Sequence, residues 1–81
     1  MENGRLYSTL DVYIISWIYL TTGVYPELIN HNGKVSFNLP LTEKVTQAIN
    51  AYHSGEKIEA FKYSLTIKNL KAQIFLKKNN G

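Results

Sequence analysis

Apolar residues are densest in the run STLDVYIISWIYLTTG, which extends from Ser8 to Gly23 with few polar interruptions. Ser8 and Asp11 have the spacing of a capping box, in which two side chains satisfy free amides at the start of a helix. Gly23 is the residue type that most readily takes the left-handed conformation after a last helical turn. The pattern therefore predicts a helix bounded by Ser8 and Gly23.

This predicted helix has two apolar faces. The broader face, which we expect in the core, contains Leu10, Tyr13, Ile14, Trp17, Ile18 and Leu20. The opposite side carries a narrower stripe of Val12, Ile15 and Tyr19. A helix that is apolar nearly all round must be covered on both sides, by the same chain or by a partner. The stripe is therefore either packed inside the fold or a surface that binds a partner protein or a second copy.

A β-hairpin is predicted for residues 25–39. Asn32 and Gly33 both accept positive φ, which favours a two-residue turn between two strands. This turn places Asn30 opposite Val35 and brings Leu28 opposite Phe37. The expected buried face contains Leu28, Val35, Phe37 and Leu39.

The second half of the chain begins with a predicted helix from Glu43 to Ser54, capped by Thr42 and closed by Gly55. A short strand is predicted for residues 56–60. Residues 63–77 fit two patterns. Strand alternation there indicates a hairpin turning at Lys68-Asn69. Helical spacing instead gives one apolar stripe of Tyr63, Ile67, Leu70 and Ile74.

Composition limits the class of protein. With 81 residues we expect a single domain, with residues 1–4 and 78–81 as loose ends. The chain contains no cysteine, so disulfides, thiolate metal sites and a cysteine nucleophile are excluded. The N-terminus has no apolar run of the signal-peptide kind, and the longest apolar run falls short of the roughly 20 residues that cross a bilayer. We expect a cytoplasmic protein that does not enter the membrane.

Charge is unevenly distributed along the chain. The formal net charge is +3, and all six acidic residues lie at or before Glu59. The basic C-terminal segment that follows contains Lys62, Lys68, Lys71, Lys77 and Lys78. Such a segment is either a solvated face or a surface for an anionic partner such as nucleic acid. Lysines act mainly as point charges, so a nucleic acid would be bound without sequence readout.

Residues for catalysis are sparse. His31 and His53, the two histidines, are not paired by their spacing, and Asp11, the sole aspartate, is assigned to capping. There is no glycine-rich phosphate loop, no paired-carboxylate pattern and no cluster of metal ligands. The sequence predicts no catalytic residue, no metal site, no cofactor and no small-molecule substrate.

Several short features together carry a family resemblance. They are the helix opening from Ser8 to Val12, Gly23, Asn32-Gly33, Val35-Ser36-Phe37, Tyr52, Gly55 and Leu70-Lys71. The chain resembles a family of short uncharacterised domains of Gram-positive bacteria, their phages and mobile elements. The resemblance implies a helix for residues 63–77, although Phe61 and Leu65 add apolar residues where that family has helix polarity. It implies no known activity.

The patterns predict a small α+β domain, and the resemblance implies the approximate order β-α-β-β-α-β-α, with two or three helices packed on one face of a small antiparallel sheet. We expect a nonenzymatic, phage-like accessory protein that acts as a protein-interaction module. It would self-associate, or it would inhibit or adapt a host or phage protein. The alternative is weak, sequence-nonspecific binding of nucleic acid through the basic C-terminal segment.

Overall fold

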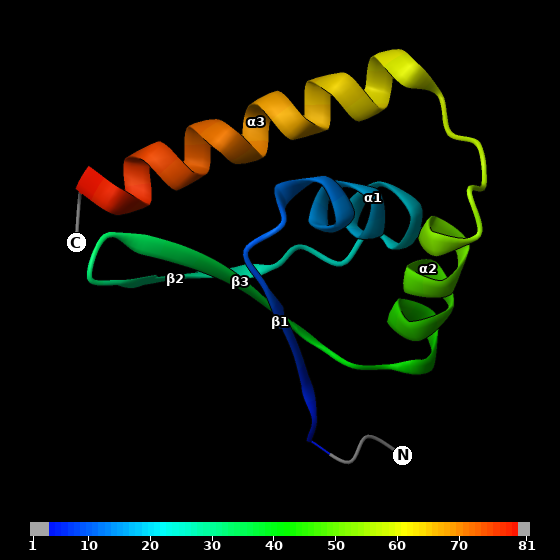
Figure 1. Cartoon of the computed structure of the whole chain (residues 1–81), viewed down its shortest axis with the longest axis horizontal. Helices are drawn as coiled ribbons and strands as arrows, with labels where there is room; N and C mark the ends of the chain where they lie inside the picture. The colour runs from blue at the N-terminus through cyan, green and yellow to red at the C-terminus, as the bar shows by residue number, and fades with distance from the viewer. Residues whose placement is uncertain (1–3, 80–81) are drawn as a thin grey trace.

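The computed structural model describes residues 4–79 and has the element order β-α-β-β-α-α (Figure 1). The elements are β1 (Leu6–Thr9), α1 (Val12–Thr22), β2 (Glu27–His31), β3 (Lys34–Pro40), α2 (Glu43–His53) and α3 (Ala60–Asn79). An antiparallel sheet with helices on one side confirms the predicted α+β class. Of the predicted loose N-terminal residues 1–4, the first three lie outside the described residues.

The sheet has the strand order β1-β3-β2, so β3 is central and both neighbours are edge strands. The predicted hairpin register is confirmed, because Leu28 pairs with Phe37 and Asn30 pairs with Val35. Asn32 and Gly33 both have positive φ, at 56° and 84°, as the two-residue turn requires. Local sequence alone therefore specifies this part of the sheet.

Helix α1 begins later than predicted. Its cap is Asp11, whose carboxylate accepts a hydrogen bond of 2.8 Å from the Tyr13 amide. The predicted capping role of Ser8 is wrong, because Ser8 lies in β1 and its hydroxyl donates to Asn38 Oδ1 at 2.7 Å. Pairing of β1 with β3 holds Ser8 in an extended conformation. At the other end the prediction is confirmed, since Gly23 has a φ of 79° and its amide donates to the Tyr19 carbonyl.

Helix α1 is the centre of the core. Ile14, Trp17 and Ile18 are buried as predicted, and Phe37 and Leu39 of the sheet belong to the same cluster. The placement of Leu10 and Tyr13 in the core is wrong, because their side chains are 55% and 48% exposed. Leu10 precedes the helix, and Tyr13 lies at its rim beside α3. Leu20 is partly buried.

Helix α2 packs against α1 at one end of the molecule (Figure 1). The predicted Thr42 cap is confirmed, because its hydroxyl accepts from the Val45 amide at 3.1 Å. Val45 and Ala48 are buried, and the Trp17 indole donates to the Ala48 carbonyl at 2.8 Å. This hydrogen bond satisfies the one polar atom of a side chain that is otherwise suited to the core.

The predicted strand at residues 56–60 is wrong, and so is its place in the predicted element order. Glu59 instead caps α3, because its carboxylate accepts from the amides of Phe61 and Lys62 at 3.2 and 3.0 Å. The segment after it is a helix throughout, which excludes the hairpin alternative. Helix α3 continues to Asn79, so Lys78 and Asn79 are not part of a loose C-terminus, and residues 80–81 of the predicted loose end lie outside the described residues.

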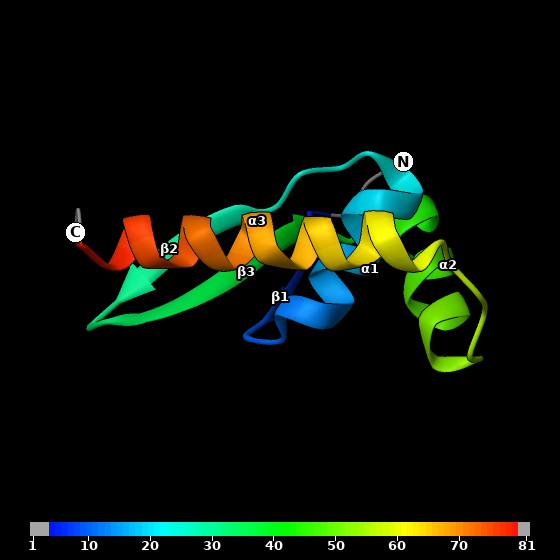
Figure 2. The ribbon, with the colours of Figure 1, turned by 90° about the horizontal axis from the view of Figure 1, so that it is seen from above.

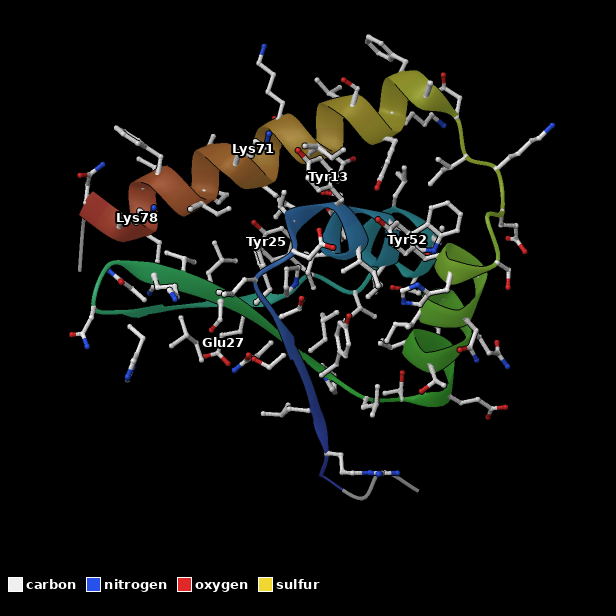
Figure 3. The ribbon with its side chains drawn as sticks, viewed as in Figure 1. Tyr13, Tyr25, Glu27, Tyr52, Lys71 and Lys78 are labelled. Carbon is white, nitrogen blue, oxygen red and sulfur yellow. The ribbon has the colours of Figure 1, made fainter. Side chains whose placement is uncertain are left out.

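The elements form layers, with the sheet below, α1 in the middle and α3 above (Figure 1). Seen from above, α3 runs along the molecule from α2 to the tip of the hairpin (Figure 2). The opposite face of the sheet carries Ser8, Ser36 and Asn38, and Glu27 points away from the helices there (Figure 3). The helices thus cover one face of the sheet, and α3 forms the outermost layer.

Candidate interaction surface

The sequence-predicted stripe on the first helix does not form a surface. Val12 and Ile15 are 8% and 0% exposed and belong to the core cluster, whereas Tyr19 is 36% exposed. Tyr19 lies beside α3, and residues four apart share one side of a helix, so α3 covers the side of α1 that carries Ile15. The expectation that Val12 and Ile15 bind a partner is therefore corrected, because another segment of this chain already covers them.

The inner face of α3 carries the predicted stripe of Tyr63, Ile67, Leu70 and Ile74. Leu70 is 2% exposed, and the Tyr63 hydroxyl donates to the Tyr13 carbonyl at 2.8 Å. Burial raises the pKa of Tyr63 to about 12, with a smaller contribution from the neighbouring Tyr52 phenol. One side of α3 is therefore fixed on α1 by packing and by a hydrogen bond.

The opposite side of α3 is also apolar, but nothing in residues 4–79 covers it. Its apolar residues, which we call the outer stripe, are Phe61, Leu65, Ala72, Phe75 and Leu76. Phe61 and Phe75 are 71% and 67% exposed, more than any other large apolar side chain in the described range. The outer stripe is thus a second apolar face on a helix whose first face already serves the core.

The five lysines of the basic C-terminal segment do not form one surface, because they lie on different sides of α3. Lys71 and Lys78 border one side of the inner face. The Lys71 ammonium lies 5.4 Å from the centre of the Tyr13 ring, within the range of a cation–π contact (Figure 3). Lys77 lies on the other side, where it lines a hollow with Tyr25. Helical spacing places Lys62 at one edge of the outer stripe, beside Leu65, and places Lys68 within the stripe, between Phe61 and Phe75.

The fold adds a lysine that sequence reasoning missed. Lys34 of β3 and Lys78 of α3 line the same hollow of about 430 Å³, together with Leu10 and Ile74. We call this the basic hollow. Lys34 is distant from the basic C-terminal segment in sequence, so only the docking of α3 over the hairpin reveals the pair.

A third hollow, of about 270 Å³, lies on the side of α3 away from the basic hollow, between the end of α1 and the middle of α3. The rings of Tyr19 and Tyr25 meet edge to face there, with centroids 5.2 Å apart. Asn69 and Gln73 add amide groups to its wall. Burial, and then the neighbouring Tyr19, raise the pKa of Tyr25.

The two histidines lie at opposite ends of the molecule. His31 ends β2 beside the hairpin turn, and His53 ends α2 (Figure 1). Within residues 4–79, no three His, Cys, Asp or Glu side chains form a group that could hold a metal ion. The structure therefore does not bring the two histidines together.

Helical spacing could have revealed the outer stripe from the sequence. Once residues 60–79 are taken as a helix, Phe61 and Leu65 are joined by Ala72, Phe75 and Leu76 on the side opposite Leu70. Because α3 has apolar residues on two opposite sides, Phe61 and Leu65 of one side alternate in sequence with Tyr63 and Ile67 of the other. This is why the segment also fits a strand pattern. Ala72, Phe75 and Leu76 are the site residues that the sequence analysis did not single out.

Comparison with known proteins gives no family model that matches the chain, no similar curated protein and no similar solved structure. The resemblance to short domains of Gram-positive bacteria and phages therefore stays a prediction. None of the helices in residues 4–79 combines the length and apolar character needed to cross a bilayer.

Proposed function

We propose that this chain is a small nonenzymatic accessory protein, of a phage or mobile-element kind, that acts as a protein-interaction module. The observation that carries the proposal is the outer stripe of α3. Phe61 and Phe75 are about two-thirds exposed or more, at 71% and 67%, while the opposite side of the same helix packs on the core. Contiguous exposed apolar patches on small domains commonly mark binding surfaces.

The composition of the stripe also supports a protein partner. Aromatic residues are enriched at protein interfaces because they bring large apolar area with few rotatable bonds. Leu65 and Leu76 are 46% and 48% exposed, so a partner that covers the stripe would remove further aliphatic surface from water. We therefore assign partner binding to the outer stripe of α3 and not to Val12 and Ile15, which are buried.

The proposal is tested by affinity capture from lysate of the cells that produce the protein, followed by identification of the captured proteins. The test variant is Phe61→Ser with Phe75→Ser. The matched control is Leu6→Ser, because Leu6 is 61% exposed but lies in β1, on the far side of the sheet from α3. We expect a defined partner to be captured by the parent and the control and lost by the double variant. Capture that survives the double substitution would show that the stripe is not the binding surface.

A second candidate function is nucleic-acid binding, which the basic hollow favours. Lys34 and Lys78 line it together, and Lys71 lies over Tyr13 close by. Each lysine–phosphate contact contributes a slope of roughly 0.7 to 0.9 to the log–log dependence of affinity on salt. Fluorescence anisotropy with labelled DNA and RNA should therefore show steep salt dependence, lowered in Lys34→Gln/Lys78→Gln. The control is Lys44→Gln, which should leave it unchanged because Lys44 is exposed on α2 and does not line the hollow. No binding even at low salt would remove this candidate.

A further inference from the structure

The outer stripe has a shape that selects among partners. Phe61 and Phe75 lie fourteen residues apart on one helix, which corresponds to about 21 Å along its axis. Leu65 and Leu76 accompany them at the two ends, and the small Ala72 lies between. Two apolar ends with a small residue between them suit a second helix lying along α3, because the axes of packed helices approach to about 8–10 Å.

Charge on α3 disfavours a simple pairing of two copies. The helix carries five lysines and no acidic residue. Lys68 is seven residues from both Phe61 and Phe75, so it lies on the line between them. A two-fold axis that pairs Phe61 of one copy with Phe75 of the other would bring the two Lys68 side chains face to face. Like charges in that position are destabilising, so a second copy is a poor occupant.

The same lysines complement an acidic partner. Lys62 lies at one edge of the outer stripe and Lys68 lies between its two phenylalanines, and the nearest acidic residue along the chain, Glu59, is occupied as the cap of α3. A partner helix with apolar residues over Phe61 and Phe75 and carboxylates opposite Lys62 and Lys68 would cover both rings while pairing with both lysines. Charge complementarity of this kind raises association rates and suppresses wrong partners.

Other anionic partners fit the stripe less well. A single-stranded nucleic acid would stack on Phe61 and Phe75 but would leave Leu65 and Leu76 in water. A membrane surface favours a broad apolar face, whereas Lys68 lies in the middle of this one. We infer that the outer stripe binds an acidic amphipathic helix of a partner protein. This inference rests on the proposed function and names the chemistry of its partner.

The experiment uses two fluorescein-labelled designed peptides of about 18 residues, long enough to span the stripe as a helix. Both carry leucines at helical spacing on one face. One has glutamates along one edge and at the centre of that face, opposite Lys62 and Lys68, and the matched peptide has glutamine at every one of those positions. Binding to the full chain is measured by anisotropy at low salt and at about 0.15 M salt.

We expect the glutamate peptide to bind at least about tenfold tighter than the glutamine peptide at low salt, with the ratio shrinking as salt rises. In Lys62→Gln/Lys68→Gln the affinities for the two peptides should become nearly equal, and in Lys44→Gln of α2 the affinity ratio should be unchanged. Phe61→Ser/Phe75→Ser should weaken both peptides by about tenfold or more. Circular dichroism of each variant confirms that the fold is retained.

Three outcomes overturn the inference. Equal binding of the two peptides would show apolar docking without charge selection, which leaves the proposed function intact. Binding of neither peptide would refute the helical acidic partner, and capture from lysate would still test the function on its own. Tighter binding to vesicles of phosphatidylserine and phosphatidylcholine, or to labelled single-stranded DNA, would assign the stripe to a membrane or to nucleic acid.

Discussion

Leu70→Ala should be strongly destabilising, because Leu70 fastens α3 to the core. It is the one residue of α3 that is fully buried, at 2% exposure. The substitution removes three carbons, which at about 0.8 kcal/mol each amounts to roughly 2.4 kcal/mol of lost transfer free energy. A partly relaxed cavity adds to this, so we expect the free energy of unfolding to fall by about 3 kcal/mol. Domains of this size have roughly 4 to 12 kcal/mol in total.

Leu65→Ala is the matched control for this prediction. The chemical change, the helix and the change in helix propensity are the same, but Leu65 is 46% exposed. Its loss should therefore be about 1 kcal/mol or less, with no cavity. Leu70→Met, which nearly preserves volume, should cost less than about 1.5 kcal/mol and keeps the test usable if the alanine variant does not fold.

Urea unfolding with two probes measures these differences. Far-UV circular dichroism draws nearly half of its helical signal from α3, which has 20 residues against 11 in each of α1 and α2, whereas Trp17 fluorescence reports the contact of α1 with α2. If α3 detaches first in Leu70→Ala, the dichroism transition will precede the fluorescence transition. A loss in Leu70→Ala no larger than that in Leu65→Ala would refute the claim that Leu70 fixes α3.

Two further predictions concern pH and the hairpin turn. Because the folded state raises the pKa of Tyr63 from 10.0 to about 12, it favours the neutral phenol, and this contribution is complete below pH 10 and lost as the pH rises toward 12. Tyr63→Phe should therefore flatten the fall in unfolding free energy across that window, and an unchanged slope in urea titrations would contradict it. Gly33→Ala should lower the unfolding free energy by about 1 to 2 kcal/mol, from the positive φ alone, since the added Cβ meets nothing within 4 Å. Gly33→Asn should lose less in the same thermal or urea assay.

The parts of the fold that the sequence predicts correctly depend on neighbours in the chain. The hairpin register follows from Asn32-Gly33 and from alternation on either side. The Thr42 cap and the Gly23 stop are likewise satisfied within one helical turn. Such features need no knowledge of the rest of the molecule.

The errors arise where distant segments decide the outcome. Ser8 has the right spacing for a capping box, but pairing with Asn38 of β3 draws it into a strand. Ile15 has the right spacing for a surface stripe, but α3 crosses over that side of α1. The predicted binding site is wrong for the same reason. The inner face of α3 covers the stripe of α1, and the outer stripe of α3 is then the apolar face left exposed.

The position of α3 over α1 also has a consequence for biosynthesis. Ile15 leaves the ribosome before α3, the helix that covers it in the folded protein. Leu70 of α3 follows Ile15 by roughly 55 residues, which take about 3 to 11 seconds to synthesise. During that interval the α1 side of Val12 and Ile15 is open to solvent. A chaperone or a nascent neighbour can occupy it before α3 arrives, so slowing translation between the two helices should lower the yield of folded protein.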